Sequence, residues 1–158
     1  MQVFIMRHGE AVLDAASDAV RSLTLCGRDE SRLMAAWLNT KSVDIERVLV
    51  SPYLRAKQTL AMVREAMTLP EEEVLPELTP SGNTEHVGGY LQALAMQGVK
   101  CVLIVSHLPL VGYLVAELCP GESPPMFVTS SIANVELAGN GHGKFEWQVS
   151  PSQVIAKV

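Results

Sequence analysis

The sequence predicts a layered α/β fold, and three observations point to it. Short apolar runs typical of buried strands alternate along the chain with longer runs whose apolar residues have helical spacing. The clearest strand, residues 101–105, is continuously apolar, as strands of parallel sheets are when both faces are covered. The chain has 158 residues, 48% of them hydrophobic, which suits one hydrophobic core. We therefore expect a single domain over residues 1–158.

The elements of the first half follow from apolar spacing. Residues 3–6 are too short an apolar run for a helix and predict a buried strand. Residues 47–50 predict a second strand, followed by Ser51 as a helix N-cap and Pro52 as the first helical residue. We expect Pro70 to end that helix. Apolar residues share one face of the helix before the second strand and of the helix after it, namely Leu33, Met34, Trp37 and Leu38, and then Ala56, Leu60, Val63 and Met67.

The second half of the chain predicts helices and one parallel strand first, and short antiparallel strands towards its end. Residues 71–73 are three glutamates, which we expect in a solvated turn, and Leu91 lies in a third amphipathic helix. The strand at 101–105 is followed by Pro109, which opens a fourth helix. The last third predicts short strands that complete the sheet in antiparallel orientation, at residues 132–137, 145–149 and 154–158, with a glycine-rich hairpin loop at 139–143.

Composition argues against several classes of function. A net charge of −5 provides no basic face for nucleic acid. No apolar run reaches the roughly 20 residues of a membrane span. Arg7 interrupts the N-terminal apolar run too early for a secretory signal peptide. The three cysteines are odd in number and lack the spacing of metal ligands, so we expect free thiols and a cytoplasmic location.

Residues suited to phosphoryl chemistry follow three of the predicted strands. Arg7 and His8 follow the first, Arg55 lies in the first turn of the helix after the second, and His107 follows the strand at 101–105. A neutral imidazole can attack phosphorus, and a guanidinium can bind two phosphate oxygens at once. Ligands of open α/β sheets bind at the carboxyl ends of the strands. If these strands are neighbours, the four side chains converge on one anion pocket.

The segment Arg7-His8-Gly9-Glu10, residues 51–59 and Val105-Ser106-His107 together resemble the three signature segments of the histidine phosphatase superfamily, which includes phosphoglycerate mutases. The resemblance spans nearly the whole chain. It implies a three-layer α/β/α, phosphoglycerate mutase-like fold, with a mostly parallel sheet and antiparallel edge strands. It also implies that His8 is the nucleophile that becomes phosphorylated. The roles of binding phosphate fall on Arg7, Arg55 and His107.

A narrower resemblance concerns residues 18–24 and Gly27, which, with the short chain, are similar to the SixA-type phosphohistidine phosphatases. That resemblance implies that Arg21 contributes to the phosphate pocket. The alternative for Arg21 is a surface salt bridge with Asp14 or Asp18. The larger mutases carry a carboxylate proton donor on an insertion before the third helix, and residues 78–85 leave no room for such a lid.

The absence of a clear general acid from the sequence indicates which leaving group the enzyme handles. An alkoxide leaving group needs a proton from a positioned acid, worth roughly 10²–10⁴-fold in rate, whereas imidazole leaves more readily because its conjugate acid titrates near pH 6.5. We therefore expect phosphohistidine on a protein to transfer its phosphoryl group to His8, after which water hydrolyses the adduct. The resemblance suggests two kinds of partner, histidine-phosphotransfer domains of two-component phosphorelays and phosphocarrier proteins. We expect no metal or other cofactor, since cationic side chains supply the positive field.

Two other functions stay open. One is a phosphatase of small phosphate esters, and the other is a non-catalytic phosphohistidine-binding module, which would not need His8. Glu10, Asn83 and Glu85 are undecided as general acids. Ser106 can either donate to phosphate or serve in packing. We expect His107 to act mainly as a protonated donor.

Overall fold

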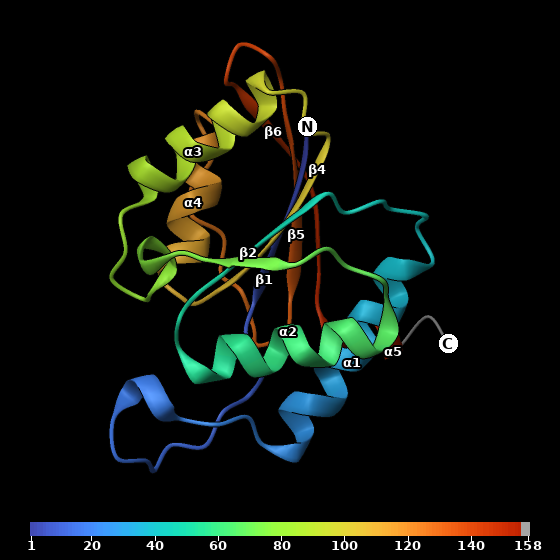
Figure 1. Cartoon of the computed structure of the whole chain (residues 1–158), viewed down its shortest axis with the longest axis vertical. Helices are drawn as coiled ribbons and strands as arrows, with labels where there is room; N and C mark the ends of the chain where they lie inside the picture. The colour runs from blue at the N-terminus through green and yellow to red at the C-terminus, as the bar shows by residue number, and fades with distance from the viewer. Residues whose placement is uncertain (156–158) are drawn as a thin grey trace.

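The computed structural model describes residues 1–155 and is built around one six-stranded sheet (Figure 1). The strand order is β3-β2-β4-β1-β5-β6. The parallel part of the sheet contains β3, β2, β4 and β1, while β5 and β6 are antiparallel to their neighbours. The strands are β1 (Gln2–Arg7), β2 (Arg47–Val50), β3 (Glu72–Val74), β4 (Cys101–Ser106), β5 (Ile132–Leu137) and β6 (Gly143–Val149).

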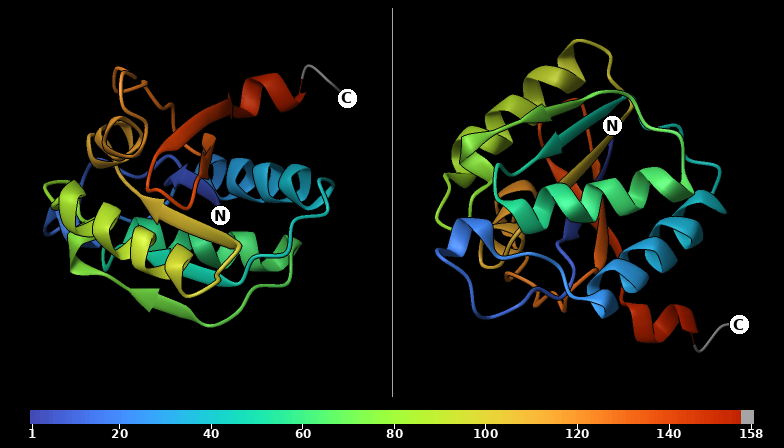
Figure 2. Two further views of the ribbon diagram at one scale, coloured as in Figure 1. Left: turned by 90° about the horizontal axis from the view of Figure 1, so that it is seen from above. Right: turned by 60° about the horizontal axis from the view of Figure 1, so that its bottom comes forward.

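Helices cover both faces of the sheet, which gives the expected three layers (Figure 2). One core contains the apolar faces of α3 (Thr84–Met96) and α4 (Leu110–Leu118). The other contains those of α1 (Leu25–Asn39), α2 (Leu54–Ala66) and the short α5 (Pro151–Ile155). Two 3-10 turns, η1 (Asp18–Val20) and η2 (Pro76–Leu78), lie in the connections. Within residues 1–155 no helix has the length and apolarity needed to cross a membrane.

Several predicted boundaries are wrong. The helix expected to begin at Ser51 and Pro52 begins at Leu54, because the Ser51 hydroxyl faces the Tyr53 amide and His107 instead of capping a helix. That helix also ends at Ala66, ahead of Pro70.

Two elements were predicted with the wrong type of structure. The glutamates expected in a turn form β3, an edge strand where Glu73 pairs with Arg47 and Glu72 with Arg64. The strand expected at 154–158 is contradicted by α5, whose first turn is fixed because the Gln153 side chain accepts from the Ser150 amide at 2.8 Å. Residues 156–158 of that predicted strand lie outside the described residues.

Two glycines allow the carboxyl end of β1 to lie against the first turn of α1. A Cβ atom at Gly9 would lie 2.7 Å from the Gly27 carbonyl oxygen, and one at Gly27 would overlap the Glu10 carbonyl oxygen. The Gly9 amide donates to the Thr59 hydroxyl of α2 at 2.9 Å. The glycine after His8 is therefore required by backbone packing, which fixes where His8 lies.

We predict opposite effects on stability for alanine at two helical glycines. Gly27→Ala should lower the free energy of unfolding by about 2 kcal/mol or more, since the new methyl group meets backbone atoms that cannot easily move. Gly89→Ala should raise it by up to about 1 kcal/mol, because Gly89 is an exposed helical residue with open space around it. Urea denaturation of both variants measures the difference. Equal effects at the two positions would contradict the packing argument.

Candidate active site

The register of three parallel strands brings the predicted side chains together. Arg7 of β1 pairs with Ser106 of β4, so the next residues, His8 and His107, lie side by side with ring centroids 5.0 Å apart. β2 adjoins β4 on its other side, and Ser51 lies 2.7 Å from His107, Oγ to Nε2. Arg55 Nε donates to His8 Nε2 at 3.3 Å. The carboxyl ends of β1, β4 and β2 therefore build one site.

His8 has the tautomer and charge of a nucleophile. Its Nδ1 lies 2.7 Å from the Gly9 carbonyl oxygen, which can only accept, so Nδ1 carries the proton and the lone pair is on Nε2. Burial and the positive charges of Arg55, Arg7 and Arg21 lower the pKa of His8 to about 4, although the bond to Gly9 raises it. The imidazole is thus neutral at pH 7.

His107 is also neutral in the free protein. Burial, His8 and Arg55 lower its pKa to about 3, with a smaller opposite effect from Asp18. The protonated donor that we expect when phosphate is bound stays a prediction. The Nδ1 atom of His107 is buried and has no hydrogen-bond partner among residues 1–155. That nitrogen is available to an incoming ligand.

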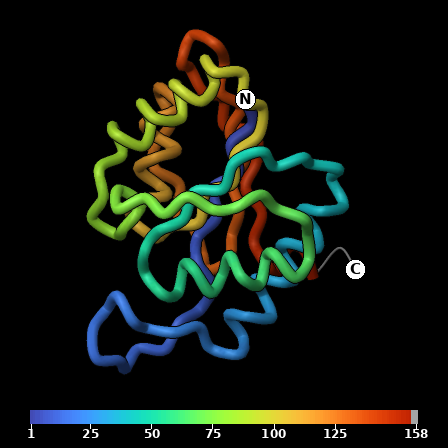
Figure 3. Tube along the Cα trace, in the orientation of Figure 1, coloured from blue at the N-terminus to red at the C-terminus, as the bar shows by residue number. Residues whose placement is uncertain are grey.

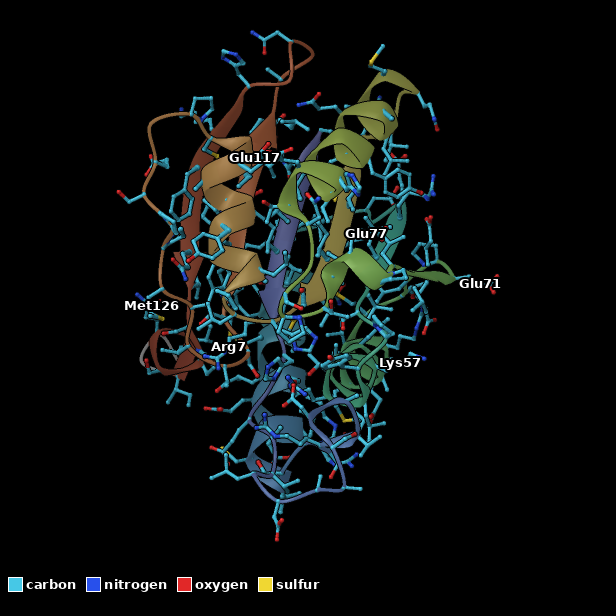
Figure 4. All side chains as sticks on the ribbon, turned by 90° about the vertical axis from the view of Figure 1, so that its left-hand side faces the viewer. Arg7, Lys57, Glu71, Glu77, Glu117 and Met126 are labelled. Atoms are coloured by element: carbon cyan, nitrogen blue, oxygen red, sulfur yellow. The ribbon has the colours of Figure 1, made fainter. Side chains whose placement is uncertain are left out.

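Arg7 is held by the segment between α4 and β5. Its terminal nitrogen donates to the Phe127 carbonyl oxygen at 2.8 Å, and its Nε is buried without a partner in the described chain. Burial and neighbouring Arg55 lower the pKa of Arg7. In Figure 4, Arg7 lies at the lower end of the sheet, near the segment that carries Met126. Because Arg7 Nε is a buried cationic donor without a partner and lies close to the charge of Arg55, the space around these two side chains is suited to bind an anion.

Arg55 and Arg21 meet at Asp18 in η1. Buried Arg55 donates to the Asp18 carbonyl oxygen at 2.6 Å and to its carboxylate at 3.2 Å. Arg21 donates to the same carboxylate at 3.0 Å and to the Val12 carbonyl oxygen at 2.7 Å. The salt bridge weighed as the alternative for Arg21 thus exists, with Asp18 and not with Asp14, and it places Arg21 beside Arg55. Figure 3 shows the segment between β1 and α1, which contains η1, projecting beyond the end of the sheet.

The undecided candidates for a general acid are engaged elsewhere or solvated. The exposed Glu10 carboxylate accepts from the Thr24 hydroxyl at 2.9 Å, and Asn83 caps α3 by accepting from the amides of Glu85 and His86. Glu85 is exposed in the first turn of α3. Ser106 donates to the Leu78 carbonyl oxygen at 2.6 Å, which is the packing role. Within residues 1–155, none of these four side chains bonds to His8, His107 or the three arginines.

Sequence reasoning missed three residues that shape the site. Ser51 was expected only as a cap, yet it fixes the ring of His107. Tyr53 packs against His107, with ring centroids 5.2 Å apart, and the guanidinium of Arg55 lies over its ring. Thr59 holds the Gly9 amide. All three lie in residues 51–59, one of the segments that resemble the histidine phosphatase superfamily. Their place in that segment is the feature of the sequence that could have identified them.

The fold and this site, a neutral histidine among arginines at the end of a parallel strand, are those of a histidine phosphatase. The family model of the histidine phosphatase superfamily (branch 1) matches residues 3–79. The chain is 66% identical to phosphohistidine phosphatase SixA of Escherichia coli (strain K12) over 152 residues, which cover 96% of this chain and 94% of that protein. The chain belongs to this superfamily and to its SixA-type group.

Two further comparisons agree. The phosphohistidine phosphatase SixA homolog of Haemophilus influenzae (strain ATCC 51907 / DSM 11121 / KW20 / Rd) is 43% identical over 159 residues, covering 96% of this chain and 97% of the relative. The solved structure of the protein histidine phosphatase SixA complexed with tungstate superposes with a TM-score of 0.95 at 66% identity, covering 96% of this chain and 98% of that one.

We predict that the site destabilises the protein as the pH falls. The folded-state pKa values of His8 and His107, about 4 and about 3, lie below the ordinary 6.5, so below pH 6.5 the unfolded chain binds more protons. The free energy of unfolding should fall by up to about 1.4 kcal/mol per pH unit for each histidine between pH 6.5 and 4.5. Urea denaturation across this range measures the slope. A double variant, His8→Asn with His107→Asn, should flatten it, and an unchanged slope would refute the assignment.

Proposed function

We propose that this chain is a protein phosphohistidine phosphatase in which His8 is the nucleophile. The observation that carries the proposal is the neutral His8, whose Nε2 lone pair faces Arg55 at the end of β1. The relatives support it, because their names give that activity and one was solved with tungstate, an oxyanion of the shape of phosphate.

The proposed reaction has two steps. The Nε2 lone pair of His8 attacks phosphorus, and the bond from phosphorus to the substrate imidazole breaks with its electron pair staying on the leaving nitrogen. The substrate ring carries a proton on its other nitrogen, so that it leaves as neutral imidazole. Arg7, Arg21 and Arg55, with His107 Nδ1, bind the equatorial oxygens and stabilise their charge. A bound phosphoryl dianion also raises the pKa of His107, which favours its protonated form as a donor. Water then cleaves the phosphorus–nitrogen bond of the His8 adduct and releases phosphate.

The carboxylates around the site favour an imidazole leaving group over an alkoxide. Asp18 is the carboxylate that contacts the arginines, and its bonds to Arg21 and Arg55 lower its pKa, so it stays ionised at pH 7 and holds no proton to donate. The alkoxide leaving group of an ester would need such a proton. With a substrate phosphohistidine, the imidazole of His8 replaces another imidazole on phosphorus, and this leaving group needs no proton from a carboxylic acid. This argues against the phosphate-ester alternative.

Exposed apolar side chains near the site support a protein substrate. Leu13 and Val20 are 90% and 49% exposed on the segment that carries Arg21, and Met126 and Val128 are 76% and 52% exposed on either side of Phe127, which binds Arg7. Exposed apolar residues gathered around a site are typical of protein interfaces. We propose histidine-phosphotransfer domains of phosphorelays or phosphocarrier proteins as substrates, and a single cytoplasmic domain over residues 1–158.

The first test follows phosphate release from a phosphohistidine protein and from a small phosphomonoester. We expect the protein to be dephosphorylated at least about tenfold faster per enzyme, because the ester lacks an acid. His8→Ala should abolish both reactions. Equal cleavage of the ester would favour the phosphate-ester alternative. Binding of the phosphoprotein without turnover by the wild type would favour the binding module.

A second test addresses the apolar surface. Met126→Asp should raise the KM for the phosphoprotein several-fold and leave cleavage of a small phosphoramidate unchanged. The reason is that only a protein substrate is large enough to contact the exposed apolar side chains around the site. Met96→Asp is the matched control, since Met96 is 85% exposed at the end of α3 that leads into the start of β4, at the opposite end of that strand from His107. Equal effects of the two variants on the phosphoprotein would contradict the proposed docking surface.

A further inference from the structure

Asp18 links two phosphate-binding arginines that come from different elements. Its carboxylate accepts from Arg55 of α2 at 3.2 Å and from Arg21 at 3.0 Å, and its carbonyl oxygen accepts from Arg55 at 2.6 Å. The same Arg55 guanidinium donates through Nε to His8 Nε2. Asp18 therefore contacts two of the arginines that we propose bind phosphate, and it makes no hydrogen bond to His8 within residues 1–155.

We propose that Asp18 is a positioning and charge-balancing residue, which holds Arg21 and Arg55 in place and limits the affinity for phosphate so that the product can leave. The proposal rests on the proposed function for the identity of the product.

The charges of the site support this assignment. Arg7, Arg21 and Arg55 are cationic, while His8 and His107 are neutral in the free protein. Before His107 takes up a proton, the three guanidinium groups exceed the Asp18 carboxylate by two charges, which equals the charge of a phosphate dianion. Without Asp18 the cations would exceed the charge of the dianion, and phosphate would bind more tightly than turnover requires.

The exposure of Asp18 makes its substitution informative. The Asp18 side chain is 55% exposed, whereas that of Arg55 is 4% exposed. Asparagine at position 18 therefore leaves no buried cavity and keeps an oxygen that can accept from an arginine, and its backbone carbonyl still bonds to Arg55. The substitution removes the charge while most of the geometry stays.

Two interpretations of Asp18 predict opposite changes in oxyanion affinity. If it only supported the fold of η1, Asp18→Asn would loosen the arginines and weaken the binding of oxyanions. If it balances charge, the same variant binds oxyanions more tightly. Coulomb's law in a water-like medium gives a change on the order of tenfold for a dianion a few ångströms away.

The experiment measures tungstate binding to the full chain by calorimetry for the wild type, Asp18→Asn and Asp14→Asn. Asp14 is the matched control, because it is exposed on the same segment and makes no hydrogen bond or ion pair within the described residues. We expect Asp18→Asn to bind tungstate about tenfold more tightly than the wild type. We expect Asp14→Asn to stay within about twofold, since an exposed charge that bonds to none of the arginines is screened. Unchanged or weaker tungstate binding by Asp18→Asn, or equal tightening by both variants, overturns the proposal.

Steady-state kinetics give a second readout on the same variants. With the phosphohistidine protein, Asp18→Asn should lower KM and the inhibition constant of inorganic phosphate together and lower kcat, because release of phosphate becomes slow. A raised KM with unchanged phosphate inhibition would indicate a structural role and overturn the proposal. A wild type that fails to hydrolyse phosphohistidine would refute the proposed function alone, since the tungstate comparison needs no substrate.

Discussion

The parallel pairing of β1 with β4 is the constraint on which the site depends. Arg7 lies opposite Ser106, and the His8 amide continues the ladder by donating to the Ser106 carbonyl oxygen at 2.9 Å. A shift of one residue would turn successive side chains to opposite faces of the sheet and separate the two histidines. The apolar residues of both strands prevent such a shift because each face packs in its own core. Packing of the sheet thus fixes the positions of His8 and His107 relative to each other.

Burial of this site has an electrostatic consequence. Two imidazoles and the Arg55 guanidinium lie almost out of contact with water, and the cations could not share that space with a charged histidine. The low pKa values of His8 and His107 follow from this crowding. The same crowding leaves Arg7 Nε and His107 Nδ1 without partners in the described chain. One arrangement therefore keeps His8 neutral and leaves two buried nitrogens that can donate to an anion.

The sequence predicted that Arg7, His8 and His107 follow buried strands and that Arg55 opens the helix after another, because each of these strands is a short apolar run. That these three strands are neighbours, which the convergence of the four side chains requires, comes from the structure. The partners of these side chains could not be predicted, since Ser51 and Asp18 reach them through tertiary contacts. The edge strand β3 was missed because glutamates have low β-propensity, and its ladder with β2 and its ion pairs with arginines on other elements are tertiary contacts. The helix α5 was missed because five residues are too few for a helical period.

The connection between β3 and α3 accounts for both the chemistry and the substrate size that we propose. It consists of η2 and a few loop residues, and Ser106 binds it to the end of β4 through the Leu78 carbonyl oxygen. A connection this short and this well anchored adds no long lid over the site, and within residues 1–155 none of its carboxylates bonds to the histidines or arginines of the site. The first absence leaves room for a histidine displayed on a folded protein. The second restricts rapid turnover to leaving groups that need no acid, such as the imidazole of that histidine.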